Sequence, residues 1–128
     1  AYVRMGLVPG DGGAYYLPRI VGVAKALDLI WTGKIIDAQE ALRIGYVSEV
    51  VPHADLLAHT LRYAEQLANG PKIAIKFAKR LVYNGLTMTL DQSLEAAAAA
   101  FSSVQQTEDH KEGPRAFIEK RDPQFKGY

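Results

Sequence analysis

The chain has 128 residues and a mass of 14.0 kDa, with 15 basic and 14 acidic side chains, three histidines and no cysteine. A net charge of +1 gives no general electrostatic reason to expect a nucleic acid or an anionic membrane as partner. The lack of cysteine excludes disulfides, thiolate nucleophiles and Cys-ligated metal centres. No apolar run approaches the roughly 20 residues of a membrane span, and the first residues lack the basic-then-apolar pattern of a signal peptide, so we expect a soluble, cytoplasmic domain with one modest core.

The first fifty residues predict a mixed α/β segment. Two short strands are predicted, over residues 1–5 and 46–51. Three helices are predicted between them, over residues 14–22, 23–32 and 38–45. The first strand begins abruptly, without a polar lead-in, which is typical of a fragment of a longer protein.

From residue 53 onward the pattern is helical. Four helices are predicted from apolar periodicity and capping signals, over residues 56–67, 71–84, 90–104 and 109–120. The chain thus divides near Pro52 into an α/β part, residues 1–52, and a helical part, residues 53–128. The alanine run 96–100 is a strong helix former, and its small side chains let a neighbouring helix approach closely.

The loop 9–13, Pro-Gly-Asp-Gly-Gly, is the most unusual local feature. Its glycines let the backbone approach a ligand, and the N-terminus of the next helix presents unpaired N–H groups to an anion or a developing oxyanion. The spacing matches neither a Walker loop nor a dinucleotide fingerprint. Spacing alone favours a tight turn in which Asp11 caps the helix.

Other charged and aromatic residues favour structural interpretations. Lys72, Lys76, Lys79 and Arg80 share one helix face, which is more typical of a solvated surface than of a phosphate site. The three histidines are scattered, so neither a metal site nor a Ser–His–Asp triad is indicated. The charges of the last helix predict an exposed face with ion pairs. Phe101 and Phe117 are most simply core residues.

Ordered motifs are more specific than any single loop. They include Gly-Leu-Val-Pro-Gly-Asp-Gly-Gly at 6–13, Leu-Pro-Arg at 17–19, Thr-Gly-Lys-Ile-Ile-Asp-Ala-Gln-Glu-Ala at 32–41, Gly-Tyr-Val-Ser-Glu-Val-Val at 45–51 and Glu-Gly-Pro-Arg-Ala-Phe-Ile-Glu-Lys-Arg at 112–121. In this order they resemble the enoyl-CoA hydratase/isomerase (crotonase) family. The resemblance covers essentially the whole chain and corresponds to the C-terminal half of a family protomer.

The resemblance implies a crotonase-like α/β fold fragment that is mostly helical, with a short β portion and a C-terminal helical region used in trimerisation. The implied assembly is a homotrimer or a dimer of trimers. The implied substrate is an acyl-CoA thioester of the kind found in fatty acid metabolism. Two backbone N–H groups would stabilise its enolate, with no metal or redox cofactor. Both of these donors, and the first hydratase carboxylate, normally come from the other half of the protomer.

The family's second hydratase carboxylate lies four residues before the glycine that matches Gly6, and this position is Tyr2. A phenol with a pKa near 10 donates a proton or a hydrogen bond but is a poor general base. Tyr2 is therefore either a catalytic residue or an aromatic wall of the pocket. Asp11 is the nearest carboxylate and a second catalytic candidate beside its role as a cap, while Gly10 is expected to line the acyl pocket.

The family also implies contacts to the adenosine-phosphate end of CoA from C-terminal helices of a neighbouring subunit. The matching positions are Phe101, whose ring would stack on adenine, and Lys120, whose ammonium would meet the 3′-phosphate. The expected function is enolate chemistry on a CoA thioester. The alternatives are an isomerase, decarboxylase or hydrolase of the same fold, or a non-catalytic CoA-binding or assembly module. We expect the isolated fragment to be inactive, because it lacks the oxyanion donors.

Overall fold

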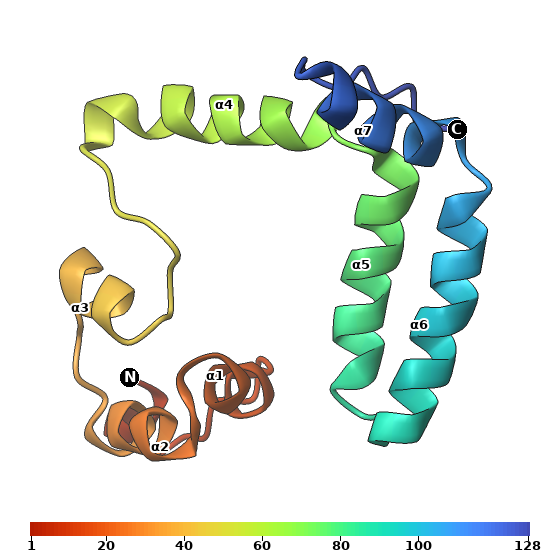
Figure 1. Ribbon diagram of the computed structural model, residues 1–128. Helices are drawn as coiled ribbons and strands as arrows, with labels where there is room; N and C mark the ends of the chain where they lie inside the picture. The colour runs from red at the N-terminus through yellow and green to blue at the C-terminus, as the bar shows by residue number, and fades with distance from the viewer. The chain divides into compact units, whose positions relative to one another are not determined.

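The computed structural model describes all of residues 1–128 and divides them into two compact units, Ala1–Asp55 and Leu56–Tyr128. Figure 1 shows helices throughout both units and no strand. None of the helices is long and apolar enough to cross a membrane.

The first unit is built around a pair of helices. Its elements in chain order are η1 (Tyr2–Met5), α1 (Gly13–Val21), α2 (Val23–Thr32), α3 (Ala38–Arg43) and η2 (His53–Asp55). Helix α1 packs against α2, and η1 also contacts α2. Asp37 accepts a hydrogen bond from the backbone N–H of Glu40 and so caps α3, as its sequence position predicts.

Both predicted strands are wrong. Residues 2–5 form the 3-10 helix η1, which ends at Gly6 with φ 71°, and residues 46–51 are bends and irregular backbone. A strand must pair its N–H and C=O groups with a neighbouring strand, and residues 1–128 contain no other strand to supply that partner. The same groups are satisfied locally instead, as where Leu7 N–H donates to the carbonyl of Tyr2.

The second unit contains the four helices predicted after residue 53, and all four are confirmed with ends that differ from the prediction by at most one residue. They are α4 (Leu56–Ala68), α5 (Lys72–Gly85), α6 (Leu90–Gln105) and α7 (Glu108–Glu119). Helices α5 and α6 lie side by side in opposite directions (Figure 1), and α4 and α7 contact α5 and α6 respectively. The capping box at the start of α6 is complete, with Thr89 and Gln92 each accepting from the other's backbone N–H.

The alanine run lies where α5 meets α6. Ala96, Ala99 and Ala100 line a hollow together with Phe77 and Leu81 of α5, and Ala100 is buried. The small side chains of this run therefore lie at the contact between α5 and α6.

The buried core consists of small side chains. Ala26, Ala41, Ala100 and Ala116 are the buried apolar residues, and no large side chain is fully buried. Phe101 and Phe117 are 62% and 85% exposed, so their interpretation as core residues is wrong. An amphipathic helix buries its apolar face only where another layer covers it, and none covers these two side chains within the chain.

Candidate functional site

A cavity of about 460 Å³ lies in the first unit, between the glycine loop, η1, α1 and α2. It is mostly apolar with a few polar groups, as ligand pockets commonly are. Its lining residues are Ala1, Tyr2, Pro9, Asp11, Gly13, Tyr16, Leu17, Ile20, Leu29, Ile30, Lys34, Ile36 and Tyr46. The cavity therefore contains both residues that the sequence nominated as catalytic.

Tyr2 and Asp11 are directly bonded in this cavity. The Tyr2 hydroxyl donates a hydrogen bond to Oδ2 of Asp11 over 3.1 Å, while Oδ1 of Asp11 accepts from the backbone N–H of Gly13 over 3.0 Å. Each carboxylate oxygen thus has its own donor. One bond ties the loop to η1, and the other ties it to the first residue of α1.

This geometry pushes the two pKa values apart. The N–H of Gly13, together with the Tyr2 hydroxyl, holds the pKa of Asp11 below its ordinary value. The hydrogen bond to Asp11 and the negative charge of its carboxylate raise the pKa of Tyr2. At neutral pH the pair is consequently a protonated phenol beside an ionised carboxylate.

The capping interpretation of Asp11 is confirmed in part. The N-cap position of α1 is Gly12, one residue later, in the left-handed region at φ 91°. A Cβ at Gly12 would lie 3.1 Å from the ring of Tyr16, so both the backbone and the space favour glycine here. Asp11 still bonds the first N–H of α1, so one side chain satisfies the helix start and the phenol together.

The rest of the loop contributes unevenly to the cavity. Pro9, Asp11 and Gly13 line it, whereas Gly10 is exposed and is not among the lining residues. Asp11 is the only carboxylate in the lining and Lys34 the only basic side chain. The ammonium of Lys34 is paired with Asp28 at 2.9 Å. The cavity can therefore offer a phenolic donor and one weakly basic carboxylate to a bound group.

Phe101 and Lys120 lie in the second unit. Phe101 is on α6 with an exposed ring, and Lys120 follows the last residue of α7 with an exposed side chain. Lys120 is the only non-glycine residue with positive φ, at 55°. Its ammonium group forms no ion pair or hydrogen bond within the chain.

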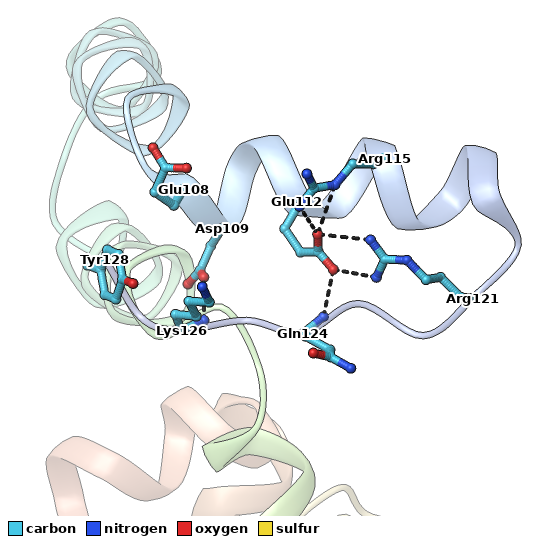
Figure 2. Close-up of a pocket in the computed structure, with 8 residues that line it drawn as sticks. All are labelled: Glu108, Asp109, Glu112, Arg115, Arg121, Gln124, Lys126 and Tyr128. Carbon is cyan, nitrogen blue, oxygen red and sulfur yellow. Dashed lines mark hydrogen bonds and ion pairs between the residues drawn. The ribbon is translucent and has the colours of Figure 1, made fainter.

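A network of ion pairs surrounds Glu112 on α7 (Figure 2). Arg115 and Arg121 both donate to its carboxylate, as does the backbone N–H of Gln124. These donors, led by Arg121, hold the pKa of Glu112 far below its ordinary range, and Glu112 in turn raises the pKa of Arg121. The ion pairs predicted for this helix are present, but Glu112 is only 7% exposed, so the prediction of an exposed charged face is wrong at this position.

Asp109 forms a second buried anchor one turn earlier. It is 5% exposed and accepts hydrogen bonds from the backbone N–H groups of Lys126 and Gly127. In return, the carbonyl of Tyr128 accepts from the N–H groups of Glu108 and Asp109 at the start of α7. Residues 121–128 are thus held along α7 by two buried carboxylates, and the network lines a charged cavity of about 570 Å³.

Sequence reasoning missed several of these residues. Lys34 and Tyr46 join the cavity from segments that are distant from Tyr2 in sequence, and no local pattern indicates this. The burial of Asp109 and Glu112 could have been predicted from their helical spacing with Ala116, which is also buried on α7. The four basic residues on α5 are exposed, in agreement with the solvated-face interpretation. No group of three or more His, Asp or Glu side chains is arranged to hold a metal ion.

Comparison with known proteins gives consistent matches. The enoyl-CoA hydratase/isomerase family matches residues 1–128. The chain is 44% identical over 124 residues to a probable enoyl-CoA hydratase of Rhizobium meliloti, covering 97% of this chain and 48% of the relative. It is 37% identical over 123 residues to the crotonyl-CoA hydratase of Syntrophomonas wolfei, covering 96% of this chain and 47% of the relative.

Solved structures give the same result. The crystal structure of an enoyl-CoA hydratase from Geobacillus kaustophilus superposes with a TM-score of 0.92 at 39% identity, over 98% of this chain and 48% of that one. The chain therefore spans about half the length of the relatives that it matches.

Proposed function

Because the chain belongs to the enoyl-CoA hydratase/isomerase family, we propose that it supplies part of the active site of an enzyme that acts on acyl-CoA thioesters. The observation that supports this most directly is the hydrogen bond between Tyr2 and Asp11 in the wall of an otherwise apolar cavity. An acyl chain would lie against the apolar side chains, with its reacting carbons near the phenol.

The chemistry that we propose is enolate formation on the thioester. Two backbone N–H groups from the other half of the protomer would stabilise the enolate oxygen. Tyr2 would donate a proton or hydrogen bond at the acyl carbons, since its raised pKa keeps the phenol protonated. Asp11 would orient the phenol, and its lowered pKa makes it a weaker base than an ordinary carboxylate.

Hydration of an enoyl-CoA is the first candidate reaction, because the relatives described above are named as hydratases. The second carboxylate of a hydratase would stand where this chain has Tyr2, and a phenol is a poor general base. This favours isomerase, decarboxylase or hydrolase chemistry as the alternative. The exposed apolar side chains of α4 and α6, such as Leu57 and Phe101, support a further alternative, a non-catalytic CoA-binding or assembly module.

The second unit would serve binding and assembly in this proposal. Phe101 and Lys120 would contact the adenine and the 3′-phosphate of a CoA held by a neighbouring subunit. A homotrimer or a dimer of trimers would cover the exposed apolar faces of the helices and bring these residues to that CoA. No metal or redox cofactor is required by this chemistry.

The test is the loss of enoyl-thioester absorbance with crotonyl-CoA, measured on the intact protein that carries this chain and on the 128-residue chain alone. We expect turnover by the intact protein and none by the chain alone, because the oxyanion donors are outside it. If the intact protein binds crotonyl-CoA but leaves its absorbance unchanged, hydratase activity is rejected. Because a shifted double bond or hydrolysis of the thioester would also remove this absorbance, chromatography identifies the product of any turnover, and the absence of any product favours a non-catalytic module.

A further inference from the structure

The end of helix α7 has an unusual residue at its point of reversal. Lys120 N–H donates to the carbonyl of Phe117 and Arg121 N–H donates to that of Ala116, which is the pattern of a Schellman motif. The residue at the left-handed position of this motif is usually glycine, because a Cβ is strained there. Here a lysine occupies it, at φ 55°.

Lys120 gains no contact within the chain to offset this strain. Its side chain is exposed, and its ammonium has no partner among residues 1–128. The two neighbouring side chains are fully engaged by contrast, since Arg121 pairs with Glu119 and with Glu112. A charged side chain held at a strained position without an internal partner is suited to a ligand from outside the chain.

Glu112 is the group that holds this reversal in place. It binds the guanidinium of Arg121, directly after Lys120, and it also accepts the backbone N–H of Gln124 at 2.9 Å (Figure 2). A single buried carboxylate therefore draws the segment 121–124 back against α7. The chain can return along the helix in this way only if it reverses at Lys120.

We propose that Glu112 is a positioning residue for Lys120, acting through Arg121 to present the lysine ammonium to the 3′-phosphate of CoA. This rests on the proposed function, which assigns Lys120 to that phosphate. Glu112 does not touch the ligand. It fixes where the cation stands, so its loss should weaken recognition of the phosphate without affecting the thioester end.

The experiment compares the affinity of CoA with that of 3′-dephospho-CoA by calorimetric titration of the intact protein, so it does not depend on turnover. Arg121→Gln removes the link between Glu112 and the segment after Lys120. Arg115→Gln is the matched control, because Arg115 also pairs with Glu112 but lies on α7, five residues before Lys120. Glu112→Gln and Lys120→Ala complete the set.

We expect Lys120→Ala to weaken CoA binding about tenfold, the effect of losing one charge-assisted hydrogen bond, while binding of dephospho-CoA stays the same. Arg121→Gln and Glu112→Gln should lower the preference for CoA over dephospho-CoA severalfold, and Arg115→Gln should not. Combining Glu112→Gln with Lys120→Ala should add no further loss of preference.

Three results would overturn the proposal. One is an equal effect of Arg121→Gln on both ligands, which would indicate a purely structural role. Another is an unchanged preference in both Arg121→Gln and Glu112→Gln. The third is a wild-type protein that binds CoA and dephospho-CoA equally well, which would show that Lys120 does not bind the 3′-phosphate. Turnover of crotonyl-CoA by that same protein would leave the proposed acyl-CoA chemistry standing, so the two failures are distinguishable.

Discussion

The hydroxyl of Tyr2 lies 3.1 Å from Oδ2 of Asp11, and these two residues also line the same cavity. Two separate interpretations of the sequence, an aromatic in place of a carboxylate and an acid in a glycine loop, thus refer to one pair of side chains. The pair is held together because Gly6 reverses the chain after η1 and the helix start at Gly13 fixes the other oxygen of Asp11.

The phenol of Tyr2 should be required for activity of the intact protein. Tyr2→Phe keeps the ring and removes the donor, so we expect kcat to fall about 100-fold, within the range for loss of a general acid. Tyr46→Phe is the matched control, since Tyr46 lines the same cavity without a hydrogen bond to Asp11. Equal effects of the two substitutions on crotonyl-CoA turnover would argue that Tyr2 is only a wall of the pocket.

Asp11 should affect both activity and folding of the first unit. In Asp11→Asn the side-chain oxygen can still accept from Gly13 N–H, but the charge that raises the pKa of Tyr2 is lost. We therefore expect the alkaline limb of the pH–rate profile, which reports ionisation of the phenol, to shift to lower pH. Asp11→Ala also removes the acceptor at the helix start and should lower the melting temperature more than Asp11→Asn does. If the alkaline limb of the pH–rate profile does not move in Asp11→Asn, that limb does not report the ionisation of Tyr2.

Glu112 should make the stability of the chain depend on acid pH. Its donors hold its pKa far below the ordinary value of 4.5, so the unfolded chain takes up a proton below pH 4.5 that the folded chain does not. The free energy of unfolding therefore falls as pH drops below 4.5, with about one proton of this uptake due to Glu112. Denaturant titrations from pH 3 to pH 7 should show that the free energy of unfolding falls less at low pH in Glu112→Gln than in the wild type.

The control for this prediction is Glu119→Gln, which removes the exposed carboxylate partner of Arg121 and leaves Glu112 in place. In this variant the free energy of unfolding should fall at low pH as steeply as in the wild-type chain. If the free energy of unfolding falls equally at low pH in Glu112→Gln and in the wild type, Glu112 does not contribute to the pH dependence of stability.

Lys120 should be a position where stability and ligand binding oppose each other. Lys120→Gly relieves the left-handed strain and should raise the free energy of unfolding by about 1 kcal/mol. Lys120→Ala keeps a Cβ and should give no such gain. Chemical denaturation measures both, and equal stabilities of the glycine and alanine variants would show that the backbone at residue 120 is unstrained.

The capping box of α6 should contribute measurably to the second unit. Thr89→Ala removes the acceptor for Gln92 N–H and should cost about 1 kcal/mol of unfolding free energy. Thr87→Ala is the matched control, because the Thr87 hydroxyl donates to the carbonyl of Asn84 and caps no N-terminus. A smaller loss for Thr89→Ala than for Thr87→Ala would contradict the role of the box.

Local sequence determined the helices of this protein well. The caps at Asp37 and Thr89 and the apolar periodicity of α4, α5 and α6 act over three or four residues, so their energetics are contained in a short window. The ordered motifs were also sufficient to place the chain in its family. These motifs identify the family because they depend on the order of residues and not on their packing.

Only the tertiary structure decided the state of residues 1–5 and 46–51, the exposure of Phe101, and the environment of Glu112. The two strand predictions failed because strand formation depends on a partner segment, which a β-propensity does not reveal. Exposure of Phe101 depends on which layers cover α6, and burial of Glu112 depends on a tail that returns from residues 121–128. The bond between Tyr2 and Asp11 belongs to the same class, because it needs both the left-handed turn at Gly6 and the start of α1 at Gly13.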